Sequence, residues 1–175
     1  MKHILRFWLL LVITFSCVLG IVYLVVQQDM RMSANDPQIQ MAEDTASSLD
    51  NGKQITLSQN NIDIAKSLSP FIMTFDVSGK VQSSEATLGG VTPVVPEGVF
   101  MNGAANGQDR FTWQPETGVR IAAVVTKYNN GFVLAGRNIR EVEKREDNLF
   151  KQILFGWLAT VIITFFASLI LIRKK

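Results

Sequence analysis

The chain has 175 residues, a length that suits one small domain with appendages. Hydrophobic residues make up 47% and charged residues 18%, which is too apolar for a disordered chain or for an average soluble domain. The single cysteine excludes a disulfide framework, and one cysteine with one distant histidine exclude a zinc finger or another Cys/His metal cluster.

Two uncharged apolar runs, residues 7–26 and 153–172, contain the excess apolarity. Each has about the 20 residues that a helix needs to cross ~30 Å of hydrocarbon. Trp8 and Trp157 lie near the ends of the runs, where aromatic side chains anchor spans at the membrane interface. The first run is longer than the roughly 7–15 residues of a signal-peptide core, and no cleavage site follows it closely. We therefore predict two uncleaved membrane spans.

The charges beside the two runs predict their orientation. The short tails carry five cations and no acid, whereas residues 27–152 hold the remaining 12 Lys and Arg against 15 Asp and Glu, a net charge of −3. Basic residues in short tails stay on the cytoplasmic side of a membrane. We predict a plasma (inner) membrane protein with both termini in the cytoplasm and an extracytoplasmic central domain.

After the first run the chain turns polar, so the first helix is predicted to leave the membrane and to stop near Asn35. Asp36 is a natural N-cap for a second helix with Pro37 at its first position, because the residue before a proline avoids helical geometry. Asn51 and Gly52 supply the stop. This helix carries one apolar stripe, which consists of Ile39, Ala42, Ala46 and Leu49.

From residue 69 onward the pattern changes to short β-rich runs. The Asn130–Gly131 pair between two such runs is the strongest hairpin signal in the chain. A connector rich in glycine and proline, residues 89–107, separates the early runs from the late ones, with a short helix expected near residues 96–102. The predicted strands are residues 71–75, 80–84, 110–114, 119–128 and 132–137, and a last helix runs from Ile139 into the second span.

Five antiparallel strands with helices gathered on one side make an α+β domain. The order of elements is two strands, a helical crossover and a three-strand meander. This order resembles that of the extracytoplasmic PAS-like, or single-Cache, domains of bacterial sensor kinases and chemoreceptors. The segments that carry the resemblance are SLSPFIMTFDVSGKV, RFTWQPETGVRIAAVV and NNGFVLAGRNIREVE, within residues 36–146. The resemblance implies a ligand pocket beside the inner face of the meander.

Sensors of this kind continue past the second span into a HAMP segment, a kinase or a signalling coiled coil. Here three residues follow Ile172. We therefore expect output through a separate signalling or envelope protein, with plasma-membrane signal transduction as the setting.

Enzymatic chemistry is not expected in the central domain, because that segment contains no histidine and no cysteine. A serine nucleophile would need a lysine base, and serine–lysine pairs at the observed spacing occur by chance. Asp76, Asp109 and Glu116 adjoin turns, where acids commonly cap the backbone. We expect no catalytic residue, no cofactor and no metal site, and a domain of net negative charge makes nucleic acid an improbable partner.

Binding of an anionic ligand is the more specific expectation. Arg120 shares an otherwise apolar face of the strand at residues 119–128, so it could hold a carboxylate in a bidentate contact if that face borders a pocket. The alternative is an ion pair between Arg120 and Asp76 or Glu116, and Trp113 also suits core packing. The candidate ligand-binding residues are Arg120, Trp113, Arg110 and Arg137.

The last helix carries a seam of residues at 3,4,3,4 spacing that is interrupted by one acid. The seam could pair with the first stalk or with a second copy in a homodimer. The seam residues are Ile139, Val142, Glu146, Leu149 and Ile153.

The predicted organisation has seven parts: tail 1–6, span 7–26, stalk 27–35, domain 36–138, helical stalk 139–152, span 153–172 and tail 173–175. The predicted function is that of a sensory or accessory protein in the lipid bilayer, which binds a small molecule or an envelope partner. The alternative is a structural or assembly protein whose PAS-like domain is a ligand-free interaction module. A well-packed domain without a ligand pocket favours that alternative.

Overall fold

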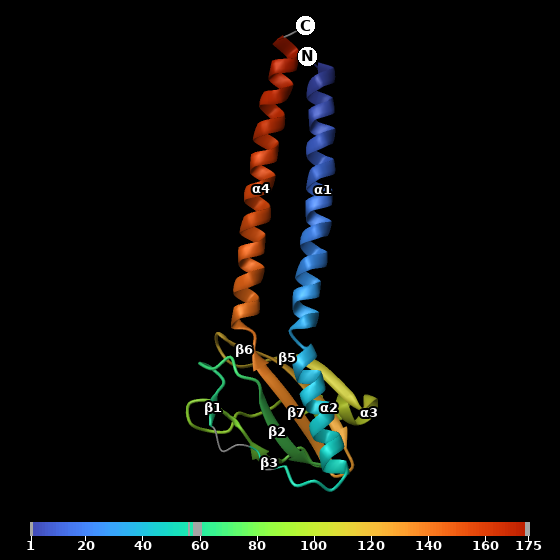
Figure 1. The fold of residues 1–175 in the computed structure, drawn as a ribbon, viewed down its shortest axis with the longest axis vertical. Coiled ribbons are helices and arrows are strands. Elements are labelled where there is room, and N and C mark those ends of the chain that lie inside the picture. Colours follow the sequence, from blue (N-terminus) through green and yellow to red (C-terminus); the bar gives the residue numbers. More distant parts are fainter. Residues whose placement is uncertain (1, 56, 58–60, 174–175) are drawn as a thin grey trace. The chain divides into compact units, whose positions relative to one another are not determined.

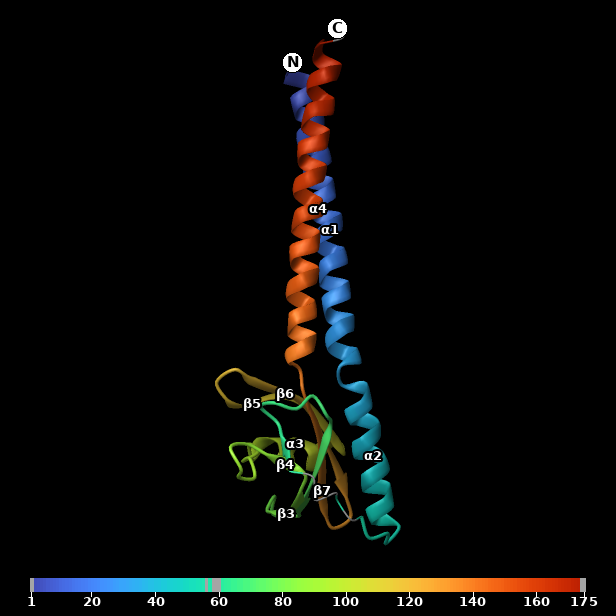
Figure 2. The same cartoon turned by 60° about the vertical axis from the view of Figure 1, so that its left-hand side comes forward.

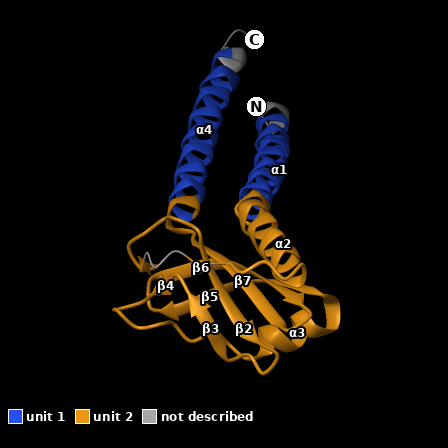
Figure 3. Cartoon of the chain, turned by 60° about the horizontal axis from the view of Figure 1, so that its bottom comes forward, with its two compact units in different colours: residues 1–31, 143–175 blue, residues 32–142 orange. Residues whose placement is uncertain are grey.

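The structure is a computed structural model that describes residues 2–55, 57 and 61–173 (Figure 1). Of the predicted tails, Met1, Lys174 and Lys175 lie outside the described residues. The chain divides into two compact units (Figure 3). One unit comprises residues 1–31 and 143–175, and the other comprises residues 32–142.

The first unit consists of two long helices, α1 (Lys2–Ser33) and α4 (Arg140–Arg173), each of which extends slightly into the second unit. Both predicted spans lie inside these helices. The most apolar 18-residue windows have mean hydropathies of 2.8 and 2.3, and no residue of either window is buried. Both helices are therefore long enough and apolar enough to cross a membrane.

Polar contacts join α1 to α4 within the apolar segments. The indole N–H of Trp8 donates to Thr164 Oγ1 at 3.1 Å, and that of Trp157 donates to Ser16 Oγ at 2.8 Å. Tyr23 and Phe150 meet edge to face, with ring centroids 5.7 Å apart. Each tryptophan thus bonds to the opposite helix, and its place at a membrane interface stays a prediction.

The second unit is an α+β domain around a five-stranded antiparallel sheet of order β3-β2-β7-β6-β5. The predicted strands are all present, with bounds shifted by a few residues. The Asn-Gly hairpin is confirmed, because β6 ends at Tyr128 and β7 begins at Gly131. The sheet strands are β2 (Phe71–Asp76), β3 (Val81–Ser84), β5 (Gln108–Glu116), β6 (Val119–Tyr128) and β7 (Gly131–Asn138).

Helices cover both faces of the sheet, so the prediction that they gather on one side is wrong (Figure 2). On one face, α2 (Asp36–Asp50) packs Ala42 against Val124 and Ala135. On the other face, α3 (Gly98–Asn106) contributes Val99 and Phe100 to the main core. Both outcomes follow from apolar side chains alternating to the two faces of each central strand.

Two further differences concern short elements. The N-cap of α2 is Asn35, whereas Asp36 is already helical, so the prediction of Asp36 as N-cap is wrong. The Asn35 carbonyl accepts the first helical hydrogen bond, from the Ile39 amide at 3.0 Å, and no side-chain cap bond forms. A short parallel pair, β1 (Ile62–Asp63) and β4 (Ala86–Thr87), was not predicted. Two residues are too few for any alternation to be visible in the sequence.

Candidate functional site

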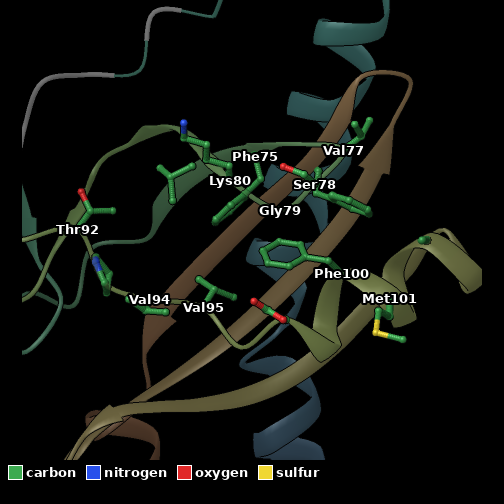
Figure 4. Close-up of a pocket in the computed structure, with 15 residues that line it drawn as sticks. Phe75, Val77, Ser78, Gly79, Lys80, Thr92, Val94, Val95, Phe100 and Met101 are labelled. Atoms are coloured by element: carbon green, nitrogen blue, oxygen red, sulfur yellow. The ribbon is translucent and has the colours of Figure 1, made fainter.

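A groove opens on the sheet domain between the β2–β3 turn, the segment at residues 92–97 and α3 (Figure 4). Its volume is about 910 Å³. We call it the turn groove. It is lined by Phe75, Val77, Ser78, Gly79, Lys80, Val81, Thr92, Pro93, Val94, Val95, Glu97, Phe100, Met101, Ala104 and Phe132.

The floor of the turn groove is aromatic and buried. Phe100 packs between Phe75 and Phe132, with ring centroids 4.8 Å and 5.3 Å apart. All three side chains are buried members of the main core. Gly79 has φ +80° and lies so close that a Cβ there would sit 3.0 Å from the Phe100 ring, so this turn position requires glycine.

The rim of the turn groove exposes large apolar side chains. Val77, Val94 and Met101 are 74%, 86% and 74% exposed. They come from three separate segments, the β2–β3 turn, the connector and α3, and they surround the aromatic floor in Figure 4. Lys80 and Glu97 are the charged residues of the lining. An apolar patch of this kind on a soluble domain is typical of an interaction site.

Hydrogen bonds to one carboxylate fix the turn at the rim. Asp76 Oδ1 accepts from the amide and the hydroxyl of Ser78 at 2.8 Å and 2.6 Å and from the Lys80 amide at 3.0 Å. The Ser78 hydroxyl bond, with the amide of Lys80, lowers the pKa of Asp76 below the ordinary carboxyl value. The turn is therefore preorganised while Asp76 is ionised.

The four predicted ligand-binding residues do not come together. Arg110 is opposite Val124 and Arg137 is opposite Ala122, so both share a sheet face with Arg120 on the side that α2 covers. Trp113 is opposite Ile121 on the other face and is 4% exposed in the main core. The sheet therefore separates the indole from the arginines.

The three arginines are exposed, and the structure gives each a local setting. Arg110 Nε donates to Gln108 Oε1 and Arg137 Nε donates to the Leu68 carbonyl, both at 3.1 Å. The Arg120 carbonyl accepts from the amide of Ile139 at the end of β7. These arginines lie on the surface of the sheet domain rather than in a closed pocket.

The main core lies on the sheet face that α3 covers, the face on which the turn groove also opens. Fifteen buried hydrophobic residues form one cluster there. Among the residues that the structure describes, every buried side-chain nitrogen or oxygen has a hydrogen-bond partner. The same residues include no group of three His, Cys, Asp or Glu that could hold a metal ion.

Sequence reasoning missed the turn groove because its parts are far apart in the chain. The glycines and prolines of the connector predict a loop, although the connector also contains Val91, Val94 and Val95. The available signal was the presence of apolar residues in a segment without β or helical periodicity. A loop that is fully exposed to solvent is usually polar, so these residues indicate packing or binding.

An ion pair joins the two helices of the first unit. Arg31 Nε and a terminal guanidinium nitrogen donate to the two oxygens of Glu146 at 2.9 Å and 3.0 Å, and Gln27 Nε2 adds a contact at 3.4 Å. This bidentate bond raises the pKa of Arg31 above its ordinary value. The acid that interrupts the predicted seam therefore binds α1 directly.

Comparisons with known proteins give no relative: no protein-family model, no curated protein and no solved structure matches this chain. The geometry of the chain's own residues therefore carries the functional argument.

Proposed function

We propose that the protein is a membrane-anchored accessory protein whose PAS-like sheet domain lies outside the cytoplasm and binds another envelope protein. A separate membrane protein then carries the output. The observation that carries this proposal is the turn groove, in which Val77, Val94 and Met101 are at least 74% exposed around a buried aromatic floor. Exposing three large apolar side chains to water has a free-energy cost that an occupant can remove.

Filling of the main core favours a protein partner over a small internal ligand. Trp113, Phe71 and Met73 are buried on the sheet face that α3 covers, and the space left on that face is the turn groove, which is open at the surface. An open groove with an exposed apolar rim suits a protein segment better than an enclosed small molecule. The interaction module that the sequence allowed as an alternative thus receives the stronger support.

The membrane setting is supported by the first unit. Both helices expose apolar side chains along their apolar windows, which would be unfavourable in water and is favourable in lipid. Bonds from Trp8 to Thr164 and from Trp157 to Ser16 satisfy the indole groups between the helices, where water is not available.

Site-specific cross-linking in native membranes tests the proposal. The photoreactive residue benzoylphenylalanine is placed at Met101 in the groove of the full-length protein, and at Thr112 on the opposite sheet face as a matched exposed control. We expect one partner protein to be cross-linked from position 101 and not from position 112. The variant Val94→Glu should remove that product, because it puts a charge beside the aromatic floor. Equal products from both positions would contradict the proposal.

A second candidate function is recognition of an anionic ligand by the arginine face. The favouring observation is that Arg110, Arg120 and Arg137 share one face on three adjacent strands. Isothermal titration of the full-length protein with succinate and with inorganic phosphate tests this function. Binding that Arg120→Ala abolishes would support it, and unchanged affinity in that variant would remove the assigned role of Arg120.

A further inference from the structure

Strand β3 forms one end of the five-stranded sheet, and β2 is the strand with which it pairs. In an antiparallel pair, alternate residues direct their backbone N–H and C=O groups away from the neighbouring strand. Val81, Gln82 and Ser83 are exposed. Within the described part of the chain, no other strand pairs with β3, so its outer edge is a template for an added strand.

The turn groove borders one face of this edge. Val81 lies opposite Phe75 and lines the groove, together with Lys80 before it. Phe75 and Phe132 belong to the same sheet face and form the floor. An added strand beside β3 would therefore direct every second side chain toward an apolar hollow.

A second hollow of about 450 Å³ borders the other face of the same edge. Thr74 and Ser83, which are opposite each other on β2 and β3, line it. The remaining lining residues are Leu49, Gly52, Lys53, Gln54, Ile55 and Gln82. We call it the Gln82 hollow. Its lining is more polar than that of the turn groove, and it contains one cation.

We propose that the β3 edge binds an extended segment of a partner protein whose side chains alternate between apolar and polar, by addition of a strand to the sheet. Apolar side chains enter the turn groove and polar side chains enter the Gln82 hollow. This inference rests on the proposed function, because it specifies how the accessory domain holds its protein partner. Strand addition takes affinity from main-chain hydrogen bonds and specificity from hollows that accept alternate side chains.

The arrangement favours an extended peptide over other occupants. A lipid chain would fill the turn groove alone and would make no use of the backbone edge or of the polar hollow. The pairing of β2 with β3 shifts register between Thr74 and Phe75, and β3 has four residues. A short, bulged edge resists indiscriminate pairing of sheets, so the two hollows select the segment that binds.

The test uses full-length protein in nanodiscs and a fluorescein-labelled peptide in which valine alternates with threonine between terminal lysines. A control peptide of the same composition groups its valines together. We expect saturable binding of the alternating peptide, measured by fluorescence anisotropy, and binding of the grouped peptide that is weaker by about tenfold or more. Equal binding of the two peptides would overturn the proposal.

Variants locate the peptide on the protein. Val94→Glu and Met101→Glu should each weaken binding by about tenfold or more, because a charge replaces an apolar contact in the groove. Both side chains are at least 74% exposed, so these variants should fold. Val91→Glu is the matched control: this valine is 69% exposed and does not line the groove, and its variant should bind normally. An effect of the same size from Val91→Glu would overturn the location.

Hydrogen exchange separates strand addition from simple filling of the groove. Saturation with the alternating peptide should slow exchange of those amides in residues 81–84 that point away from β2, because the added strand can bond only these. Binding without protection of these amides would mean that side chains alone fill the groove, and it would refute the strand addition. A homodimer cross-linked through Gln82→Cys would show that a second copy takes the edge instead.

The native cross-linking experiment remains independent of the peptide experiment. Cross-linking from Met101 without any peptide binding would leave the proposed function standing and would remove the strand addition. Absence of both the cross-link from Met101 and the peptide binding would contradict both the proposed function and the strand addition.

Discussion

Glu146 interrupts an otherwise apolar seam, and the structure gives this acid a defined role between α1 and α4. Its side chain is 10% exposed, whereas the side chain of Arg31, its bidentate partner, is 59% exposed. The carboxylate is thus the desolvated member of the pair, and removal of Arg31 would leave it without its principal charge partner. This asymmetry predicts that replacing Arg31 destabilises the helix pair more than neutralising Glu146 does.

We expect Arg31→Ala to destabilise the packing of α1 on α4 by about 1–2 kcal/mol, since solvent screens the exposed guanidinium and reduces the full value of a buried pair. Glu146→Gln should cost less, because a neutral amide removes the buried charge and still accepts a hydrogen bond. Thermal unfolding of the full-length protein in nanodiscs measures both effects. The neighbouring exposed acid provides the control Asp147→Asn, which should change little. Restored stability in the swapped double variant R31E/E146R would confirm a direct pair.

Protonation of Asp76 should loosen the β2–β3 turn. Its pKa is lowered in the folded protein, so the stabilisation is fully present above the ordinary carboxyl value and is lost as the pH falls through the lower folded value. Asp76→Asn should therefore lower the melting temperature at neutral pH, and the difference from the unmodified protein should disappear below the folded pKa. Calorimetry across this acidic window measures the effect. A difference that stays constant with pH would show that ionisation of Asp76 does not stabilise the turn.

At the scale of elements, the hairpin of β6 and β7 depends on Gly131. Its φ is +155°, and a Cβ there would overlap the Phe75 carbonyl oxygen on the neighbouring strand. Gly131→Ala should cost about 3 kcal/mol or more, because the backbone of the central strands must move apart. Gly118→Ala is the matched control: it also has positive φ but meets nothing within 4 Å, so its cost should be about 1 kcal/mol. Thermal unfolding compares the two, and equal losses would show that the overlap is relieved without cost.

The elements themselves were largely predictable, and their assignment to sheet faces was only partly so. Alternation and the Asn-Gly turn predict β6 and β7 because these signals depend on neighbours in sequence. The face of the sheet that α3 covers depends on contacts of Phe100 with Phe75 and Phe132, which no local period encodes. For the same reason the sequence placed Arg120 correctly on a shared strand face but could not show that Trp113 points to the opposite one.

At the scale of the molecule, the two apolar runs are offset from each other along the axis of the helix pair. Contacts of Ser16 with Trp157 and of Tyr23 with Phe150 set the antiparallel register of α1 and α4. The middle of the first run therefore meets Trp157, whereas the middle of the second lies about six residues farther along α4, or ~9 Å at 1.5 Å per residue. A tilt of the helix pair can accommodate this offset, and the long side chain of Lys151 can reach the membrane interface.

The predicted orientation follows from the five tail cations and can be measured on the whole protein. The chain has one cysteine, so Cys17→Ser gives a thiol-free background. Into it we place either Thr117→Cys, in the exposed turn between β5 and β6, or a cysteine appended after Lys175. A membrane-impermeant maleimide should label position 117 in intact spheroplasts and should label the appended cysteine only after lysis. The reverse pattern would place the sheet domain in the cytoplasm, because a chain with two spans keeps both termini on the side opposite the domain between them. It would also remove an envelope protein as the occupant of the turn groove, since the groove would then face the wrong compartment.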